Sequence, residues 1–310
     1  MLMSYAHFDD LLAVIAPLPD IPVAVVDATE AHVLQGACEA KNQSIVEPIL
    51  IGDADKIRQL LLQLGADTGS CPNFQIVPAD SPEEAADKGV EMVLSGKVQA
   101  IMKGHLHSDA FLHPILAKLR TGKRLSHVFV TDISSYHKLL LITDAAINIT
   151  PDLLTKAAIL QNAIDLAHIL DVSHPKAAIL SAVEVVNPAI VSTVDAACLS
   201  KMAERGQITD ALVDGPLAFD NAISRESAQI KGIHSAVAGD ADILVVPDLV
   251  SGNILAKDLE YLAGATMAGI VLGAKVPVIL TSRADPARAR LVSAALAALI
   301  HYHQAGAQAQ

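Results

Sequence analysis

Short apolar runs alternate with longer amphipathic stretches along almost the whole chain. The runs are aliphatic or β-branched and end in Gly, Asp, Pro or Ser, which is typical of buried strands that lead into turns. The predicted strands are Pro22–Val26, Glu47–Ile51, Phe74–Val77, Val98–Met102, His127–Thr131, Leu139–Thr143, Lys176–Leu180, Ala211–Val213, Ile243–Val246 and Pro277–Thr281. This alternation predicts an α/β protein with mainly parallel sheets covered by helices on both faces.

The stretches between the runs contain residues that commonly begin or end helices. Asp53 is positioned to cap a helix that Gly65 closes. Ser81-Pro82-Glu83-Glu84 has the pattern of a capping box with proline at the first helical position. Thr150-Pro151 and Asp285-Pro286 are predicted to open two further helices, the second being the last of the chain.

Composition restricts the class of protein. The 310 residues are 52% hydrophobic and only 3% aromatic, so the core is aliphatic, as in sheets buried on both faces. The net charge is −12 and no basic stripe is visible, which argues against a nucleic-acid partner. Residues 1–10 do not resemble a secretory leader, and no apolar run reaches the roughly 18 residues that span a membrane. We therefore expect a cytoplasmic protein with no membrane partner.

The three cysteines, Cys38, Cys71 and Cys198, are scattered and lack paired spacing. This usage is interpreted as reduced thiols in a reducing compartment. Cys198 shares a helical apolar stripe with Ile190 and Val194, which suggests a small core residue.

Three apolar runs in the second half of the chain stop at polar or glycine-rich turns, in Val213–Ser224, Ala238–Lys257 and Val276–Asp285. In α/β proteins the carboxyl ends of strands lead into ligand-binding loops. These segments therefore predict a site for a polar, anionic ligand.

These segments resemble the phosphate acetyltransferase and phosphate butyryltransferase family. The resemblance continues upstream in Ile101–His107, Arg124–Val130, Leu141–Asn148 and Lys176–Glu184. It implies transfer of an acyl group between coenzyme A and inorganic phosphate, with coenzyme A as co-substrate, no tightly bound cofactor and no catalytic metal. It also implies a homodimer.

The implied fold is similar to isocitrate and isopropylmalate dehydrogenase. Two α/β/α domains flank a central cleft, the first formed by 1–144 plus 283–310 and the second by 145–282. Sequence composition by itself shows no linker at these boundaries.

The candidate catalytic residues are Ser282, Arg283 and Asp285. Ser282 and Arg283 follow a buried strand and precede a helix, where free N–H groups and a guanidinium suit phosphate oxygens. The resemblance implies that Arg283 neutralises the phosphate and that Ser282 hydrogen-bonds the thioester. Asp285 is either a helix cap or a general base. The position seven residues past the serine, where relatives place the base, is Ala289, so the identity of the base stays open.

The candidate phosphate- and substrate-binding residues lie in three loops. Glycine permits close approach of backbone to a ligand, and a lysine beside it supplies charge. By resemblance, the residues are Lys103, Gly104, Ser108, Arg124, Ser126 and Asn253. The residues expected to contact coenzyme A are Asp248, Gly252, Gly269 and Gly273.

Other functions fit the sequence less well. His105, His107 and His113 suggest a metal site, but no Asp, Glu or Cys stands at a supporting spacing. A dehydrogenase would need nucleotide contacts, and the chain has no G-x-G-x-x-G fingerprint. An enzyme that uses acyl-carrier protein would face charge repulsion with this acidic chain. A non-catalytic binder of acyl-CoA or phosphate stays open because of Ala289, as does the length of the acyl chain.

Overall fold

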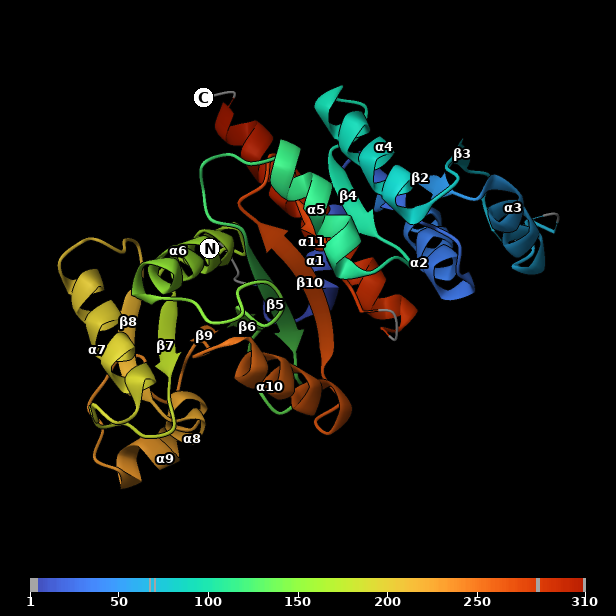
Figure 1. Ribbon diagram of the computed structural model, residues 1–310. Coiled ribbons are helices and arrows are strands. Elements are labelled where there is room, and N and C mark those ends of the chain that lie inside the picture. The colour runs from blue at the N-terminus through green and yellow to red at the C-terminus, as the bar shows by residue number, and fades with distance from the viewer. Residues whose placement is uncertain (1–4, 67, 70, 283–284, 309–310) are drawn as a thin grey trace. The chain divides into compact units, whose positions relative to one another are not determined.

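The computed structural model describes residues 5–66, 68–69, 71–282 and 285–308 (Figure 1). Helices and strands alternate along these residues, and the predicted α/β fold with a mainly parallel sheet is confirmed. In chain order the elements are α1 (Phe8–Ile15), β1 (Ile21–Val26), α2 (Ala31–Asn42), β2 (Val46–Gly52), α3 (Ala54–Gln63), β3 (Gln75–Pro78), α4 (Pro82–Leu94), β4 (Ala100–Lys103), α5 (Ser108–Lys118), β5 (Ser126–Asp132), β6 (Leu140–Thr143), α6 (Leu153–Ile169), β7 (Lys176–Leu180), α7 (Val191–Glu204), β8 (Leu212–Leu217), α8 (Phe219–Ile223), α9 (Arg225–Ile230), β9 (Ile243–Val245), α10 (Leu249–Tyr261), β10 (Thr266–Leu272), β11 (Val278–Ile279) and α11 (Ala287–Gln308).

The chain divides into two compact units. The terminal unit contains Phe8–Lys123 and Ala268–Gln310, and the central unit contains Met1–His7 and Arg124–Met267. The domain boundaries predicted at 144/145 and 282/283 lie further along the chain. The first differs because β6 pairs in parallel with β9, which ties β5 and β6 to the central unit. The predicted domain division stays a prediction.

The terminal unit is a doubly wound sheet in the order β3-β2-β1-β4-β11-β10. All of its neighbouring strands run parallel except β10 and β11, which are antiparallel. Helices α4 and α5 pack together on one face of this sheet, and α11 packs with α1 and α2 on the other (Figure 1). Both faces of the sheet are therefore covered, which explains the apolar strand sequences.

Local capping explains where several helices begin. The Asp53 carboxylate accepts from the N–H groups of Asp55 and Lys56, which confirms the predicted start of α3. Ser81 Oγ accepts from the N–H of Glu84 at 3.1 Å, as the capping-box pattern predicted for α4. Helix α6 begins two residues later than expected because the Asp152 carboxylate caps it through the N–H of Thr155.

Strand β10 was not predicted from the sequence. β10 runs antiparallel to β11, with Ile270 opposite Ile279, and contains Gly269 in its middle. Glycine inside an apolar run weakens the strand pattern, and pairing with a distant segment decides the outcome. Ser293 Oγ on α11 accepts the Gly269 N–H at 3.1 Å, so β10 is also tied to α11.

The central unit has the strand order β5-β6-β9-β7-β8. Only β5 and β6 are antiparallel among its described pairs. Helix α6 packs with α7, while α8 and α10 contribute Ala222 and Ala256 to an aliphatic core with strands β6, β7 and β9.

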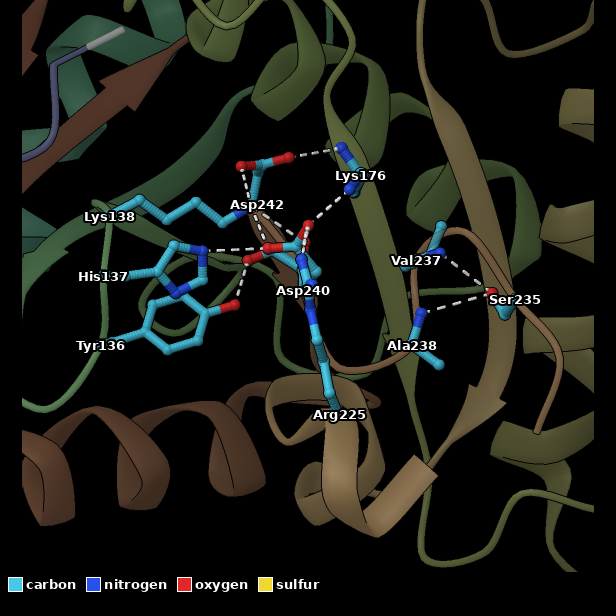
Figure 2. A network of polar contacts seen from close by, with 11 residues as sticks. Tyr136, His137, Lys138, Lys176, Arg225, Ser235, Val237, Ala238, Asp240 and Asp242 are labelled. Atoms are coloured by element: carbon cyan, nitrogen blue, oxygen red, sulfur yellow. Dashed lines mark hydrogen bonds and ion pairs between the residues drawn. The ribbon is translucent and has the colours of Figure 1, made fainter. Parts of the chain in front are cut away.

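An ionic network joins the amino ends of β7 and β9 to the loop between β5 and β6 (Figure 2). The Asp240 carboxylate is its centre, and four cationic or imidazole groups contact it. These are Lys176 Nζ at 2.5 Å, His137 Nε2 at 3.0 Å, Arg225 Nη2 at 3.1 Å and Lys138 Nζ at 3.2 Å. Asp242 adds an ion pair with Lys138 at 2.6 Å and accepts the Lys176 N–H at 2.8 Å. The network therefore links three segments that are distant in sequence, and Arg225 at the start of α9 adds a fourth.

The interpretation of the cysteines as three unpaired thiols is wrong for two of them. Cys38 on α2 and Cys71 before β3 form a disulfide across 33 residues, with 5.4 Å between their Cα atoms. Cys198 is a free thiol. Spacing could not reveal this pair, because the chain brings the two together only through the packing of α2 beside β2 and β3.

Reduction of this disulfide is expected to destabilise the terminal unit. A cross-link that closes a loop of this length lowers the entropy of the unfolded chain and so raises the free energy of unfolding by about 3.5 kcal/mol. Residual structure in the reduced, unfolded chain lowers the observed effect to about 2 to 3.5 kcal/mol. Urea unfolding with and without dithiothreitol measures this difference. The Cys38→Ser variant should match the reduced protein and should not respond to dithiothreitol. Equal stability of the oxidised and reduced proteins would contradict the prediction.

None of the helices among the described residues is long and apolar enough to cross a bilayer.

Candidate functional site

Strand order places a candidate site in the terminal unit. β1 lies between β2 and β4. The chain therefore adds β2 and β3 on one side of β1 and then crosses to the other side to add β4. Ligands of open α/β sheets bind at the carboxyl ends of strands at such a switch point. The register pairs Val26 with Lys103 and Met102 with Ile279. The ends of β1, β4 and β11, which lead to Asp27, Gly104 and Ser282, therefore share one edge of the sheet.

The loop after β4 is held tightly against the end of β1. The Gly104 N–H donates to Val26 O at 2.8 Å, and the His105 N–H donates to Asp27 O at 2.9 Å. A Cβ at Gly104 would lie 2.3 Å from Asp27 O and 2.4 Å from Val26 O. Only glycine fits this contact, which gives the predicted Lys103-Gly104 motif a local structural reason.

Lys103 places a buried positive charge at this edge. The residue is only 3% exposed at the end of β4, and its Nζ donates to Gly104 O at 3.5 Å. An ammonium group at the carboxyl end of a strand can supply positive charge to a bound anion. Ser108, the first residue of α5, is exposed, and the preceding His107 makes no side-chain cap.

The turn after β11 is built from polar contacts. The Ser282 N–H donates to Asp285 Oδ2 at 2.7 Å, and Asp285 is buried. Arg290 on α11 donates from Nη1 to Thr281 Oγ1 and from Nη2 to Ser282 O, both at 2.9 Å. The Asp285 carboxylate is thus directed back to Ser282, and α11 begins only at Ala287. A catalytic role for Asp285 stays a prediction.

Two further residues of interest in this segment are Arg283 and Ala289. Arg283 lies outside the described residues. Ala289, which stands where the resemblance implies a general base, is buried in α11, and its carbonyl accepts from Ser293 Oγ at 2.6 Å.

Histidines surround the same edge. Burial lowers the pKa of His32, and the positive charge of Arg290 lowers it further. His105 Nε2 lies 3.6 Å from Glu30 Oε1. Across the described residues, no three His, Cys, Asp or Glu side chains gather as a metal site would require.

In the central unit, the predicted residues Arg124 and Ser126 belong to a polar cluster before and within β5. Arg124 Nε donates to Asn148 Oδ1 at 3.2 Å. Ser126 is fully buried, and its hydroxyl accepts from Asn162 Nδ2 at 2.8 Å. Asp144, which sequence analysis used only as a boundary, accepts from Asn148 Nδ2 at 2.6 Å. Arg124 is exposed, and the bond between Ser126 and Asn162 joins β5 to α6; substrate contacts at both residues stay predictions.

A hollow of about 440 Å³ lies at the carboxyl ends of β7 and β9 in the central unit. Its walls are mainly apolar, with three serine hydroxyls and one carboxylate among them. They are formed by Leu180, Ser181, Ala182, Ser192, Phe219, Val246, Pro247, Asp248, Ser251 and Leu255. Ser181 Oγ and Ser192 Oγ are 2.8 Å apart. Of these residues only Asp248 was predicted at a site; the others follow strands whose ends are common binding positions.

The predicted coenzyme A contacts fall in different settings. Asp248 caps α10 by accepting the Ser251 N–H at 2.8 Å and lines the hollow. Gly252 is buried, and a Cβ there would lie 2.6 Å from Val246 Cγ2, so it serves close helix–strand packing. Asn253 is exposed, and its amide donates to Ala145 O at 3.4 Å.

The two remaining glycines belong to the terminal unit. Gly269 uses its N–H and C=O in bonds to Ser293 and Leu280. Gly273 has a positive φ of 91° and accepts from Thr121 Oγ1. Coenzyme A contacts at these glycines stay predictions.

Both the sequence and the fold are similar to those of known acyltransferases. The family model described as "Phosphate acetyl/butaryl transferase" matches residues 80–298. The chain is 51% identical to a phosphate acetyltransferase of Rickettsia prowazekii over 95% of its length and 84% of that protein. It is 43% identical to a phosphate butyryltransferase of Clostridium acetobutylicum over 90% of its length and 92% of that protein. The solved branched-chain phosphotransacylase of Enterococcus faecalis V583 aligns with a TM-score of 0.77 at 30% identity, covering 91% of this chain and 99% of that one. The chain therefore belongs to the family of phosphate acetyl- and butyryltransferases.

Proposed function

We propose that this protein is a phosphate acyltransferase, which interconverts acyl-CoA plus phosphate and acyl phosphate plus coenzyme A. The observation that carries the proposal is the edge formed by β1, β4 and β11. Buried Lys103, the backbone of Gly104 and the Ser282 turn gather there. A buried ammonium beside fixed backbone groups is suited to a phosphate or a developing oxyanion.

The proposed reaction is direct transfer in a ternary complex. A phosphate oxygen attacks the thioester carbonyl carbon, the C–S bond breaks, and the coenzyme A sulfur leaves with the bonding electrons and takes up a proton. In reverse the thiolate attacks the carbonyl of the acyl phosphate and the C–O bond to phosphate breaks. Two anions must be held in reactive positions, so orientation contributes most of the rate.

Further residues take roles in this proposal. Arg283 neutralises phosphate, Ser282 hydrogen-bonds the thioester, and Ser108, Arg124 and Asn253 contact the substrates. Asp248 and the apolar hollow beside it suit the hydrocarbon part of an acyl-CoA, because apolar walls with few hydroxyls bind such chains. We also propose that the protein works in the cytoplasm as a homodimer without a tightly bound cofactor.

Phosphate-dependent release of free thiol from acetyl-CoA and butyryl-CoA tests the proposal. Arg283→Ala is expected to lower kcat/KM by about 100-fold or more, as loss of an oxyanion donor does. Lys103→Met should lower it by about 10- to 100-fold, the value of a charged hydrogen bond. Lys118→Met is the matched control, because this lysine is partly exposed and pairs with Asp87. The ratio of the two thioesters measures the acyl preference.

The same assay separates the alternatives. Wild-type protein that releases no thiol with either thioester would show that the proposal is wrong and would favour a binder. A Phe219→Ala variant with an unchanged KM for both thioesters would show that the hollow of the central unit does not bind acyl-CoA.

A further inference from the structure

Arg290 is the most deeply buried Lys, Arg, Asp or Glu among the described residues. It is 1% exposed and has the largest volume of the fully buried side chains among the described residues. It lies on α11 between Ala289 and Leu291, where an apolar residue would satisfy the core. Burial lowers the pKa of its guanidinium, and the charge of Asp285 opposes this.

The facing helix α2 leaves room for this side chain. Gly36 lies opposite Arg290, and a Cβ there would come within 2.9 Å of Arg290 Cδ and 3.1 Å of its Cβ. α2 and α11 pack directly on each other. A glycine in a helix interior lowers helix stability by about 1 kcal/mol relative to alanine, so Gly36 destabilises α2. The buried charge of Arg290 is a second unfavourable contribution, on α11.

The guanidinium reaches from α11 to the end of β11. Nη1 donates to Thr281 Oγ1 and Nη2 to Ser282 O, each at 2.9 Å. From the other side the buried Asp285 carboxylate accepts the Ser282 N–H at 2.7 Å. The peptide groups on both sides of Ser282 are therefore each held by a charged side chain.

Stability alone does not account for this arrangement. Replacing a buried charged group with an apolar residue of similar volume is often neutral or stabilising, since removal of a charge from water costs several kcal/mol. The planar fork of arginine fixes two acceptors at once, whereas the lysine ammonium is a point charge on a flexible stem. The arrangement therefore fixes the backbone on both sides of Ser282, and with it the direction in which the Ser282 side chain leaves the strand.

We propose that Arg290 is a positioning residue for acyl transfer, whose buried fork holds Thr281 and Ser282 in the reactive arrangement without touching substrate. This inference rests on the proposed function. A displacement of about 1 Å in a reacting group can lower the rate by about 100-fold.

The test compares Arg290→Met, Arg290→Lys and the control Arg288→Met in the thiol-release assay, together with thermal unfolding. Arg288 is on the same helix but 42% exposed and paired with Asp9. We expect Arg290→Met to lower kcat by about 100-fold with KM values for phosphate and acyl-CoA within about threefold. Arg290→Lys should restore only part of kcat, because one ammonium cannot replace both bonds. Arg288→Met should leave kcat, KM and the Tm unchanged.

Three results would overturn the inference. The first is a folded Arg290→Met protein whose kcat stays within about threefold of wild type. The second applies if that variant does not fold: a folded Arg290→Lys protein with wild-type kcat would then overturn the inference. The third is a wild-type protein without thiol release, which rejects the proposed function as well. If the wild-type protein is active and the Arg290 variants keep its kcat, the positioning role is rejected while the proposed function stands.

Discussion

Replacing Gly104 with alanine is expected to lower both stability and activity strongly. The new Cβ would lie 2.3 Å from Asp27 O and 2.4 Å from Val26 O, and both atoms belong to backbone. Neither can rotate away as a side chain would, so the ends of β1 and β4 must separate. The backbone of Gly104 does not require a positive φ, so steric contact rather than strain of the alanine backbone is the cause.

The expected loss of unfolding free energy is about 3 kcal/mol or more, at the upper end for overpacked sites. The activity should fall by about 100-fold or more, because the separation moves Lys103 and the Gly104 backbone at the proposed phosphate site. Thermal unfolding and kcat/KM for phosphate measure the two effects.

Gly306→Ala is the matched control for Gly104→Ala. Gly306 lies in α11, and no atom comes within 4 Å of the place where an added Cβ would lie. Alanine there should therefore be neutral or stabilise the helix by up to about 1 kcal/mol. A Gly104→Ala protein with the Tm and activity of wild type would contradict the tight packing of the β1 and β4 ends and the importance of this edge.

Features that depend on neighbouring residues could be predicted from the sequence. The caps at Asp53 and Ser81 are examples, because donor and acceptor lie within three residues of each other. β10 and the disulfide between Cys38 and Cys71 could not, since each depends on a partner brought close by the fold. Periodicity contains no information about such pairings.

The candidate site shows the same distinction. Lys103 and Gly104 follow an apolar run directly, so their place at a strand end was predictable. Arg290 was not identified, because an arginine on an amphipathic helix is expected to face water, and only Gly36 on another helix makes its burial possible. The bond from Asn162 on α6 to the Ser126 hydroxyl was not predicted either, and a substrate contact at Ser126 stays a prediction. A side chain's direction depends on packing that the local pattern does not determine.

Asp240→Asn is expected to destabilise the central unit by about 3 kcal/mol, the lower end for loss of one partner from a buried ion pair, because Asp240 is only partly buried. The Asp240 side chain is only 13% exposed, and Lys138 and Lys176 are 20% and 28% exposed. Without the carboxylate these ammonium groups and Arg225 would lie close together, and Asp242 would neutralise only part of their charge (Figure 2). Urea unfolding followed by circular dichroism at about pH 7 measures the change.

The pH dependence of this effect has a defined sign. Burial by itself raises the pKa of Asp240, but its hydrogen bond to Lys176 and the charge of Lys138 hold the pKa well below the ordinary 3.8. The folded state therefore binds this proton less readily than the unfolded state, and the stabilisation is complete above pH 3.8. The part of the difference that comes from the Asp240 proton should stay constant from about pH 7 to 5 and shrink as the pH falls below the ordinary pKa. Asp55→Asn, at an almost fully exposed pair with Arg58, should change stability little at any pH. If Asp240→Asn were no more destabilising than Asp55→Asn, the network would not hold the three segments together.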